Sequence, residues 1–315
     1  MSLPYRLGSR SLFVRAHEDS IKPRRVVFLS SEGTKTEVQY FNFIEKYREQ
    51  LGIDSIVHIE ILKRYDTSSD PENVLELLEE YIEFRKNKMF EKEIDSLSLN
   101  HYSAEFIRTY LESPSSLSQK ECNQFHAVLQ DEHIDLLYLN FLSRYHGEDD
   151  AFGIVIDRDC GCHSVEQMNS VVKKCKEKGY LCYITNPCIE FWQLLHVSDV
   201  ASEYSESLED ILRNESDNNH NSFVSNLLYE KTGQRKAIQV KTFEKYYLPN
   251  IDLAIERAKG FAPSEQLIDK LGTNLWELIE LLRENEKFEK IPQEERNTQK
   301  LESPEISRIG EENKP

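Results

Sequence analysis

The sequence predicts an α/β fold in which a parallel sheet is flanked by helices. Two short apolar runs, at 26–29 and 152–156, have the length and composition of buried strands covered on both faces. Segments with helical spacing follow them, which is the alternation typical of a parallel sheet. Acidic residues come directly after both runs, and ligands of such sheets bind at the carboxyl ends of the strands. The predicted functional site is therefore this edge of the sheet.

The first part of the predicted core, residues 24–89, has the order strand, helix, strand, helix. Gly52 ends the first helix, and Asp70 with Pro71 begins the second. The expected elements are a basic arm at 1–23, a strand at 25–31, a helix at 36–52, a strand at 56–62 and a helix at 70–88.

Residues 90–150 interrupt this order and are expected to form a helical insertion. Their amphipathic stretches, separated by Ser-Pro-Ser-Ser and charged turns, lie at 102–111, 119–130 and 134–145. The core resumes over 151–200 with a strand at 152–157, a helix at 164–178, a strand at 180–185 and a helix at 186–196. In the last helix Asn186 is expected to be the cap and Pro187 the first helical residue.

A helical carboxyl-terminal extension is expected over 201–284. Its helices are predicted at 207–213, 222–232, 242–259 and 274–284. Residues 285–315 are polar and lack apolar periodicity, so they are expected to be a disordered acidic tail.

Composition narrows the class of protein. The 315 residues carry a net charge of −17, which argues against a protein that coats nucleic acid nonspecifically. Six irregularly spaced cysteines do not form a disulfide framework, so reduced thiols and a cytoplasmic location are expected. The sequence shows no secretory leader and no apolar run of the ~20 residues that a membrane span needs. It also lacks a P-loop motif, so any nucleotide energy would come from a partner.

The acidic residues at the strand ends predict a divalent-metal site. Asp157 and Asp159 are two positions apart on an extended segment, so their side chains point to the same side. Glu32 follows the first strand, and carboxylates that meet at one edge repel each other unless a cation lies between them. Oxygen ligands without a histidine-rich cluster favour Mg²⁺ or Mn²⁺ over zinc. Glu32, Asp157 and Asp159 are therefore the candidate catalytic and metal-binding residues.

Two further acids are candidate metal ligands, each with a structural alternative. Glu37 lies on the first turn of the first helix, where a favourable interaction with the helix dipole explains it equally well. Glu190 lies at another strand-to-helix junction, and stabilisation of its own helix is the alternative role. The C-x-C-H sequence of Cys160, Cys162 and His163 lacks the paired spacing of a structural zinc site.

Basic side chains near these acids are candidates for binding substrate phosphates. Lys35 and Arg158 lie within the two acidic motifs. A second basic cluster consists of Lys231, Arg235, Lys236 and Lys241, with the aromatic residues Phe243, Tyr246 and Tyr247 nearby. Cations beside aromatic rings suit a single-stranded or looped nucleic acid, whereas a solvated helix face is the alternative.

Three motifs together resemble the RloB family over residues 20–275. They are S-E-G-x-x-T-E after the first strand, D-R-D after the later strand, and N-P-C-I-E-F-W-Q-L-L-H at 186–196. The resemblance implies a Toprim-type catalytic core in which Glu32 is the general acid or base and Asp157 and Asp159 bind magnesium. It also implies a role in phage defence, in some cases beside an ABC-type ATPase. The insertion at 90–150 departs from a minimal Toprim core and leaves the substrate open.

The sequence and the resemblance together predict a metal-dependent endonuclease that cleaves RNA, including tRNA, or DNA. One alternative is a regulatory subunit that docks on an ATPase, and another is a nucleotidyl transferase that uses the same acids. Whether the protein forms a homo-oligomer is left open.

Overall fold

A computed structural model describes residues 24–62, 70–86, 90, 92, 94–95, 102–131, 134–147, 149–159, 161–235 and 237–283. The predicted arm at 1–23 and tail at 285–315 lie outside the described residues, as do Cys160 and Lys236.

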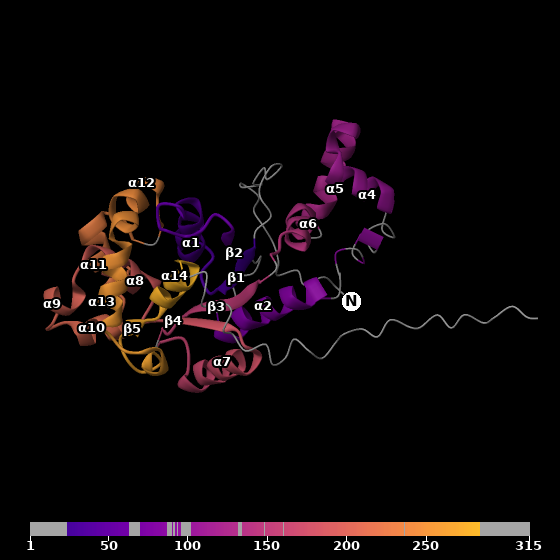
Figure 1. Ribbon diagram of the computed structural model, residues 1–315. Helices are drawn as coiled ribbons and strands as arrows, with labels where there is room; N and C mark the ends of the chain where they lie inside the picture. The colour runs from indigo at the N-terminus through magenta and orange to yellow at the C-terminus, as the bar shows by residue number, and fades with distance from the viewer. Residues whose placement is uncertain are drawn as a thin grey trace, which may run out of the picture.

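The core is a five-stranded sheet (Figure 1). Its strands, in spatial order, are β2 (Val57–Leu62), β1 (Arg25–Ser31), β3 (Ala151–Asp157), β4 (Leu181–Asn186) and β5 (Gly272–Thr273). The first four strands are parallel, and β5 pairs with β4 in the antiparallel direction. The predicted α/β class with a parallel sheet flanked by helices is thus confirmed. The sequence missed β5 because two residues are too short for any periodicity.

Helices cover both faces of the sheet, and alternate residues of each strand point to opposite faces. Val27 and Leu29 of β1 join one apolar core, whereas Val26 and Phe28 join the other. The first face is covered by α1 (Thr36–Lys46), α8 (Ile189–Val197), α11 (Phe223–Thr232), α13 (Ile251–Lys259) and α14 (Leu275–Arg283). The second is covered by α2 (Pro71–Lys86) and α7 (Val165–Lys178).

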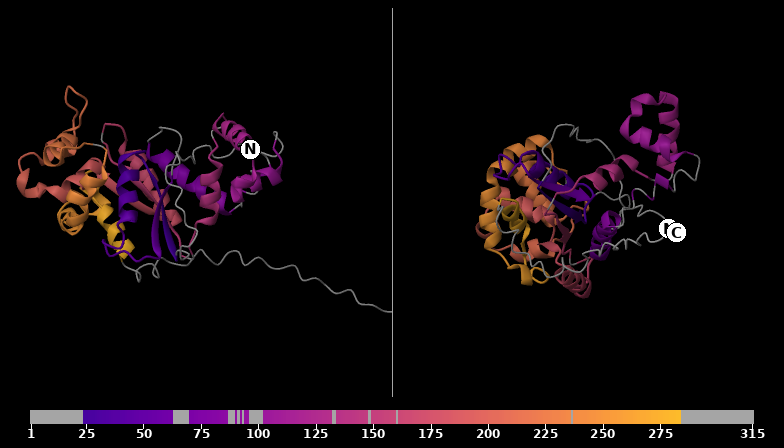
Figure 2. Two further views of the ribbon diagram at one scale, coloured as in Figure 1. Left: turned by 90° about the horizontal axis from the view of Figure 1, so that it is seen from above. Right: turned by 45° about the vertical axis from the view of Figure 1, so that its right-hand side comes forward.

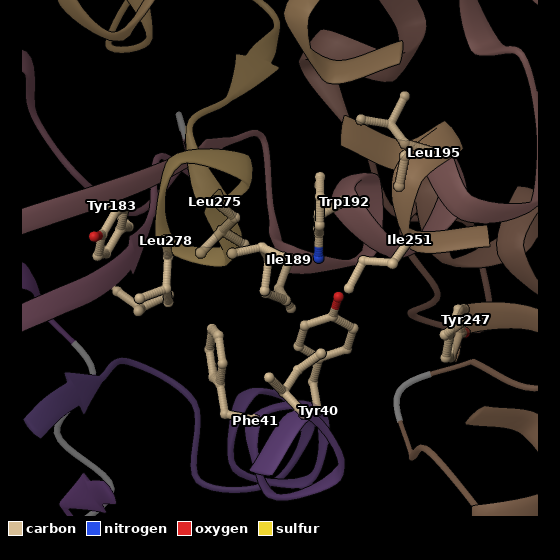
Figure 3. Close-up of a cluster of buried hydrophobic side chains, with 14 of the residues drawn as sticks. Tyr40, Phe41, Tyr183, Ile189, Trp192, Leu195, Tyr247, Ile251, Leu275 and Leu278 are labelled. Carbon is tan, nitrogen blue, oxygen red and sulfur yellow. The ribbon is translucent and has the colours of Figure 1, made fainter. Parts of the chain in front are cut away.

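Helix α8 lies at the centre of the first core. Figure 3 shows Tyr40 and Phe41 of α1 directed toward Trp192 and Ile189 of α8. The Tyr40 hydroxyl and His196 Nε2 are 3.1 Å apart, and burial lowers the pKa of His196 to about 3. The aromatic end of the N-P-C-I-E-F-W-Q-L-L-H motif therefore packs α8 against α1.

The insertion consists of α4 (Ala104–Glu112), a short 3₁₀ turn (Pro114–Ser116), α5 (Gln119–Asp131) and α6 (Leu136–Arg144). In Figures 1 and 2 it lies at the opposite end of the molecule from the carboxyl-terminal helices. The Tyr138 hydroxyl of α6 donates to Glu60 Oε1 at 3.2 Å, which connects the insertion to edge strand β2.

The extension differs from the prediction in an additional short helix, α9, and in the segment predicted as one helix at 242–259. It begins with α9 (Val200–Glu203) and α10 (Leu208–Arg213). After α11, the predicted helix at 242–259 is instead α12 (Val240–Thr242), a π turn (Phe243–Tyr247), a 3₁₀ turn (Leu248–Asn250) and α13. Pro249 explains the break, because proline lacks the amide hydrogen and its ring clashes with the carbonyl four residues earlier. A further 3₁₀ turn (Ser264–Gln266) precedes β5.

Asn186 does not cap a helix, which corrects the prediction. It is the last residue of β4 and pairs with Gly272, while α8 begins at Ile189 with Cys188 as its cap. The Asn186 amide nitrogen donates to the Leu267 carbonyl at 2.8 Å. Its side chain therefore fastens the segment before β5 to the sheet.

Within the described ranges, no helix has both the length and the apolar character needed to cross a membrane.

Candidate metal-binding site

Glu32 and Asp157 meet at the carboxyl edge of the sheet, as the parallel register of β1 and β3 requires. The Glu32 amide donates to the Val155 carbonyl at 3.0 Å, which continues the pairing of the two strands by one residue. The Asp157 amide donates to Glu32 Oε2 at 3.0 Å. His163 Nε2 lies 3.2 Å from Glu32 Oε1. Both carboxylate oxygens of Glu32 are therefore held by the protein itself.

Glu37 reaches the same edge from the first turn of α1. Its Oε1 accepts a hydrogen bond from the Gly33 amide at 3.0 Å, and the residue is 4% exposed. A Cβ at position 33 would lie 1.9 Å from Glu37 Oε2, so glycine is required for this approach. Burial raises the pKa of Glu37 to about 7, with Glu190 and Glu32 adding to the shift.

Asp157 and Glu190 complete a group of four carboxylates. Removal from water raises the pKa of Asp157 well above its usual range, and the charges of Glu32, Glu37 and Glu190 raise it further. The Ile189 amide at the start of α8 offsets part of this effect. Glu190 is 6% exposed, so this carboxylate is also buried beside the others. Three strand-to-helix junctions thus place Glu32, Glu37, Asp157 and Glu190 in one another's electric field.

The chemistry of this group fits a hard divalent cation, which carboxylate oxygens bind and whose charge relieves their repulsion. In the described part of the chain, no three His, Cys, Asp or Glu side chains already converge on a point as in a formed metal site. The hydrogen bonds above give the reason, because Glu37 is turned to the Gly33 amide and Glu32 to Asp157 and His163.

Asp159 is exposed, unlike these four acids. Its charge raises the pKa of Cys162 and adds to the rise in the pKa of His163 that the hydrogen bond to Glu32 causes. The Asp159 carbonyl accepts from the amides of Cys162 and His163, and its Oδ1 accepts from Gly161 at 3.3 Å. The D-R-D motif therefore supplies one acid to the buried group and one to the loop above it.

His163 is the residue at this site that the sequence did not assign. It belongs to the C-x-C-H sequence, yet its side chain is 4% exposed and contacts Glu32. The hydrogen bond to Glu32 raises the pKa of His163 above its usual 6.5. No motif spacing predicts this contact, because the two residues are 131 positions apart and meet only through the register of the sheet.

The two candidate phosphate-binding residues in the acidic motifs differ in their surroundings. Lys35 is exposed at the start of α1. Arg158 is 6% exposed, and its Nε and Nη1 donate to the carbonyls of Ile268 and His163, both at 2.7 Å. These bonds favour a structural role for Arg158, since a buried guanidinium already directed at two carbonyls is poorly placed for a phosphate.

The second basic cluster lies on the extension, and the structure corrects its aromatic part. Phe243 and Tyr247 are 0% and 1% exposed and belong to the core, so neither ring can stack on a ligand. Lys231 pairs with Glu203, whereas Lys241 is exposed. The Arg235 guanidinium lies 4.0 Å from the ring centroid of Tyr229, an exposed aromatic that the sequence analysis did not single out.

These features define an α/β protein with a buried acidic site at the carboxyl edge of its parallel strands. The family model of RloB-like proteins matches residues 27–282. The chain therefore belongs to the RloB-like family, which confirms the resemblance seen in its three motifs. Searches of curated proteins and of solved structures gave no match.

Proposed function

We propose that this protein is a Mg²⁺- or Mn²⁺-dependent nuclease that cleaves phosphodiester bonds in RNA, including tRNA, or in DNA. The observation that carries the proposal is the group of four carboxylates, Glu32, Glu37, Asp157 and Glu190, in which burial and then mutual repulsion raise the pKa of Asp157 and Glu37. Holding several like charges close together in a largely buried place is unfavourable, and such an arrangement is typical of functional sites.

The proposal gives the acids different roles. Asp157, Glu37 and Glu190 would hold the metal, which activates water and stabilises charge on the phosphate. Glu32 has both oxygens fixed by hydrogen bonds, so it is oriented to accept or donate a proton at the reacting oxygens. Asp159, exposed on the loop above, would join the metal shell only once substrate is bound. Lys35 would neutralise a substrate phosphate from the start of α1.

The family resemblance adds a Toprim-type core, a phage-defence setting and an ABC-type ATPase partner to this proposal. A cytoplasmic location is proposed from the irregular spacing of the six cysteines. The regulatory alternative makes a different prediction, because a subunit that only docks on an ATPase has no cleavage activity of its own.

Labelled tRNA, single-stranded DNA and duplex DNA are incubated with the isolated chain in Mg²⁺ or EDTA. Cleavage in Mg²⁺ that EDTA abolishes is expected, and Asp157→Asn should lower its rate by at least about 100-fold. Asp131→Asn on α5 is the matched control, because it makes the same charge change at an exposed position of the insertion. Cleavage by Asp157→Asn at the wild-type rate would refute the mechanism, and an inactive wild type would favour the regulatory role.

A further inference from the structure

The exposed ring of Tyr229 and the half-buried guanidinium of Arg235 have the properties of a platform for an unpaired nucleobase. Tyr229 is 45% exposed on the last turn of α11, although large aromatic side chains are usually buried. The Arg235 guanidinium carbon lies 4.0 Å from the centroid of its ring, which is a stacking distance. A planar cation on an exposed ring presents a surface on which a base can stack while a phosphate is neutralised nearby.

The turn that joins the two residues is held in place by hydrogen bonds. Gly233 ends α11 with a φ of 72°, a left-handed conformation that glycine adopts without strain, and its amide donates to the Tyr229 carbonyl at 2.7 Å. Thr232 Oγ1 accepts from the Gln234 amide at 3.1 Å. The chain is thereby reversed, so that Arg235 returns over the last turn of α11. Such an arrangement loses little conformational entropy when a ligand binds.

This part of the extension contacts the helices that carry two acids of the site. The Ile238 amide donates to Gln39 Oε1 at 2.8 Å, and Gln39 lies two residues after Glu37 on α1. Helix α11, which carries Tyr229, also packs against α8, and α8 carries Glu190 at its start. Ile238 and α11 are therefore each joined to a helix that delivers a carboxylate to the site.

We propose that Tyr229 and Arg235 bind an unpaired base of the substrate, so that the protein selects single-stranded or looped nucleic acid over duplex. This inference rests on the proposed nuclease function, because it names the substrate class of the same site. A base in a duplex is stacked on its neighbours and offers no free face, whereas a base in a loop does.

Binding is measured without divalent metal, so that cleavage does not interfere. The probes are fluorescent single-stranded RNA of about 12 nucleotides and a duplex of the same length, at one fixed low salt concentration. The wild type should bind the single strand more tightly than the duplex. Tyr229→Ala should weaken single-strand binding by roughly 5- to 100-fold and leave duplex binding unchanged. Tyr229→Phe retains the ring and should bind within about twofold of the wild type.

Leu253→Ala is the matched control, because Leu253 is 44% exposed on α13 of the same extension. Equal single-strand affinities of the wild type and Tyr229→Ala would overturn the inference, as would a wild type that binds neither probe. A wild type that binds through Tyr229 but never cleaves in Mg²⁺ would refute the nuclease proposal alone. If the wild type cleaves in Mg²⁺ and Tyr229→Ala binds the single strand as tightly as the wild type, the base-binding role of Tyr229 is refuted and the nuclease proposal stands.

Discussion

Glu32 is held at both carboxylate oxygens by the protein. The Asp157 amide fixes Oε2 and His163 fixes Oε1, so the carboxylate has one orientation before any ligand arrives. The Glu37 carboxylate accepts hydrogen bonds from the backbone amides of Gly33 and of Glu37 itself, and in the proposed mechanism it would change these contacts when a cation binds. A fixed proton-transfer group beside adjustable metal ligands is the division of roles that the proposed chemistry needs.

His163 is expected to act through Glu32. In His163→Ala the Glu32 carboxylate loses the hydrogen bond that orients it, so kcat should fall by roughly 10- to 100-fold while KM changes little. The pH at which activity is half-maximal should also move, because the variant loses the imidazole whose pKa the hydrogen bond to Glu32 raises. Steady-state kinetics between pH 5 and 9 test this expectation. A proportional loss at every pH, together with a lower melting temperature, would indicate a structural role only.

The raised pKa of Glu37 predicts how stability depends on pH. A carboxyl group with a pKa of about 7 in the folded state and 4.5 in the unfolded state binds more protons when folded. Its contribution to the free energy of unfolding therefore falls as pH rises from about 4.5 to 7, by up to about 3 kcal/mol. Glu37→Gln should be more stable than the wild type at pH 8 and similar at pH 4. Metal-free urea unfolding measures this difference, and a wild type that is more stable than Glu37→Gln at pH 8 would contradict it.

The sequence predicts the acids of the site, but it does not predict the residues that contact them. Glu32 and Asp157 were predictable because the end of a buried parallel strand has a known position at the sheet edge. The contact of His163 with Glu32 depends on register between β1 and β3, and the exposure of Tyr229 depends on which face of α11 packs on α8. Neither is encoded in local spacing. Phe243 and Tyr247 appeared suitable for stacking until the π turn placed both in the core.

The side chain of Arg158 joins two segments outside the sheet, while its backbone amide continues the pairing with β4 at the Thr185 carbonyl. Its guanidinium donates to the carbonyl of His163, on the loop after β3, and to that of Ile268, on the segment before β5. Asn186 fastens the same segment through Leu267. The loop that carries His163 and the segment before β5 are thus linked through one buried cation.

Arg158→Met is expected to lower the free energy of unfolding by about 2–4 kcal/mol, because two carbonyls lose charge-assisted hydrogen bonds in a buried place. Lys35→Met removes an exposed charge and should change stability by less than about 0.5 kcal/mol. Urea unfolding of both variants tests the assignment. If Arg158→Met is as stable as the wild type but loses substrate affinity, Arg158 contacts phosphate after all.

The elements themselves were largely predictable where apolar periodicity is long. The four parallel strands, the insertion helices and α7 lie within one or two residues of their predicted bounds. Helix α7 shows why, since Ser164 and Gln167 form a capping box and Gly179 ends the helix in a left-handed conformation. Prediction failed where tertiary contacts override local pattern, as at Asn186, or where an element is very short, as at β5 and α9.

The net charge of −17 and the repulsion among the buried carboxylates both lower the stability of the folded protein. General repulsion favours the unfolded chain slightly and is screened by any salt. Repulsion within the site is shielded from solvent, so a bound cation relieves it much better than dissolved salt does. Divalent and monovalent salts should therefore stabilise the protein to different degrees.

A ligand that binds only the folded protein stabilises it by RT ln(1 + [L]/Kd), which is about 2.7 kcal/mol at 100 times Kd. Saturating Mg²⁺ or Mn²⁺ should raise the melting temperature above the value in NaCl of equal ionic strength. Asp157→Asn should abolish this difference, and Asp131→Asn should retain it, since only Asp157 belongs to the buried group. Scanning calorimetry at pH 8, where the site is most charged, gives the clearest comparison. A melting temperature that depends on ionic strength alone in all three proteins would show that the acidic edge of the sheet binds no metal in the free protein.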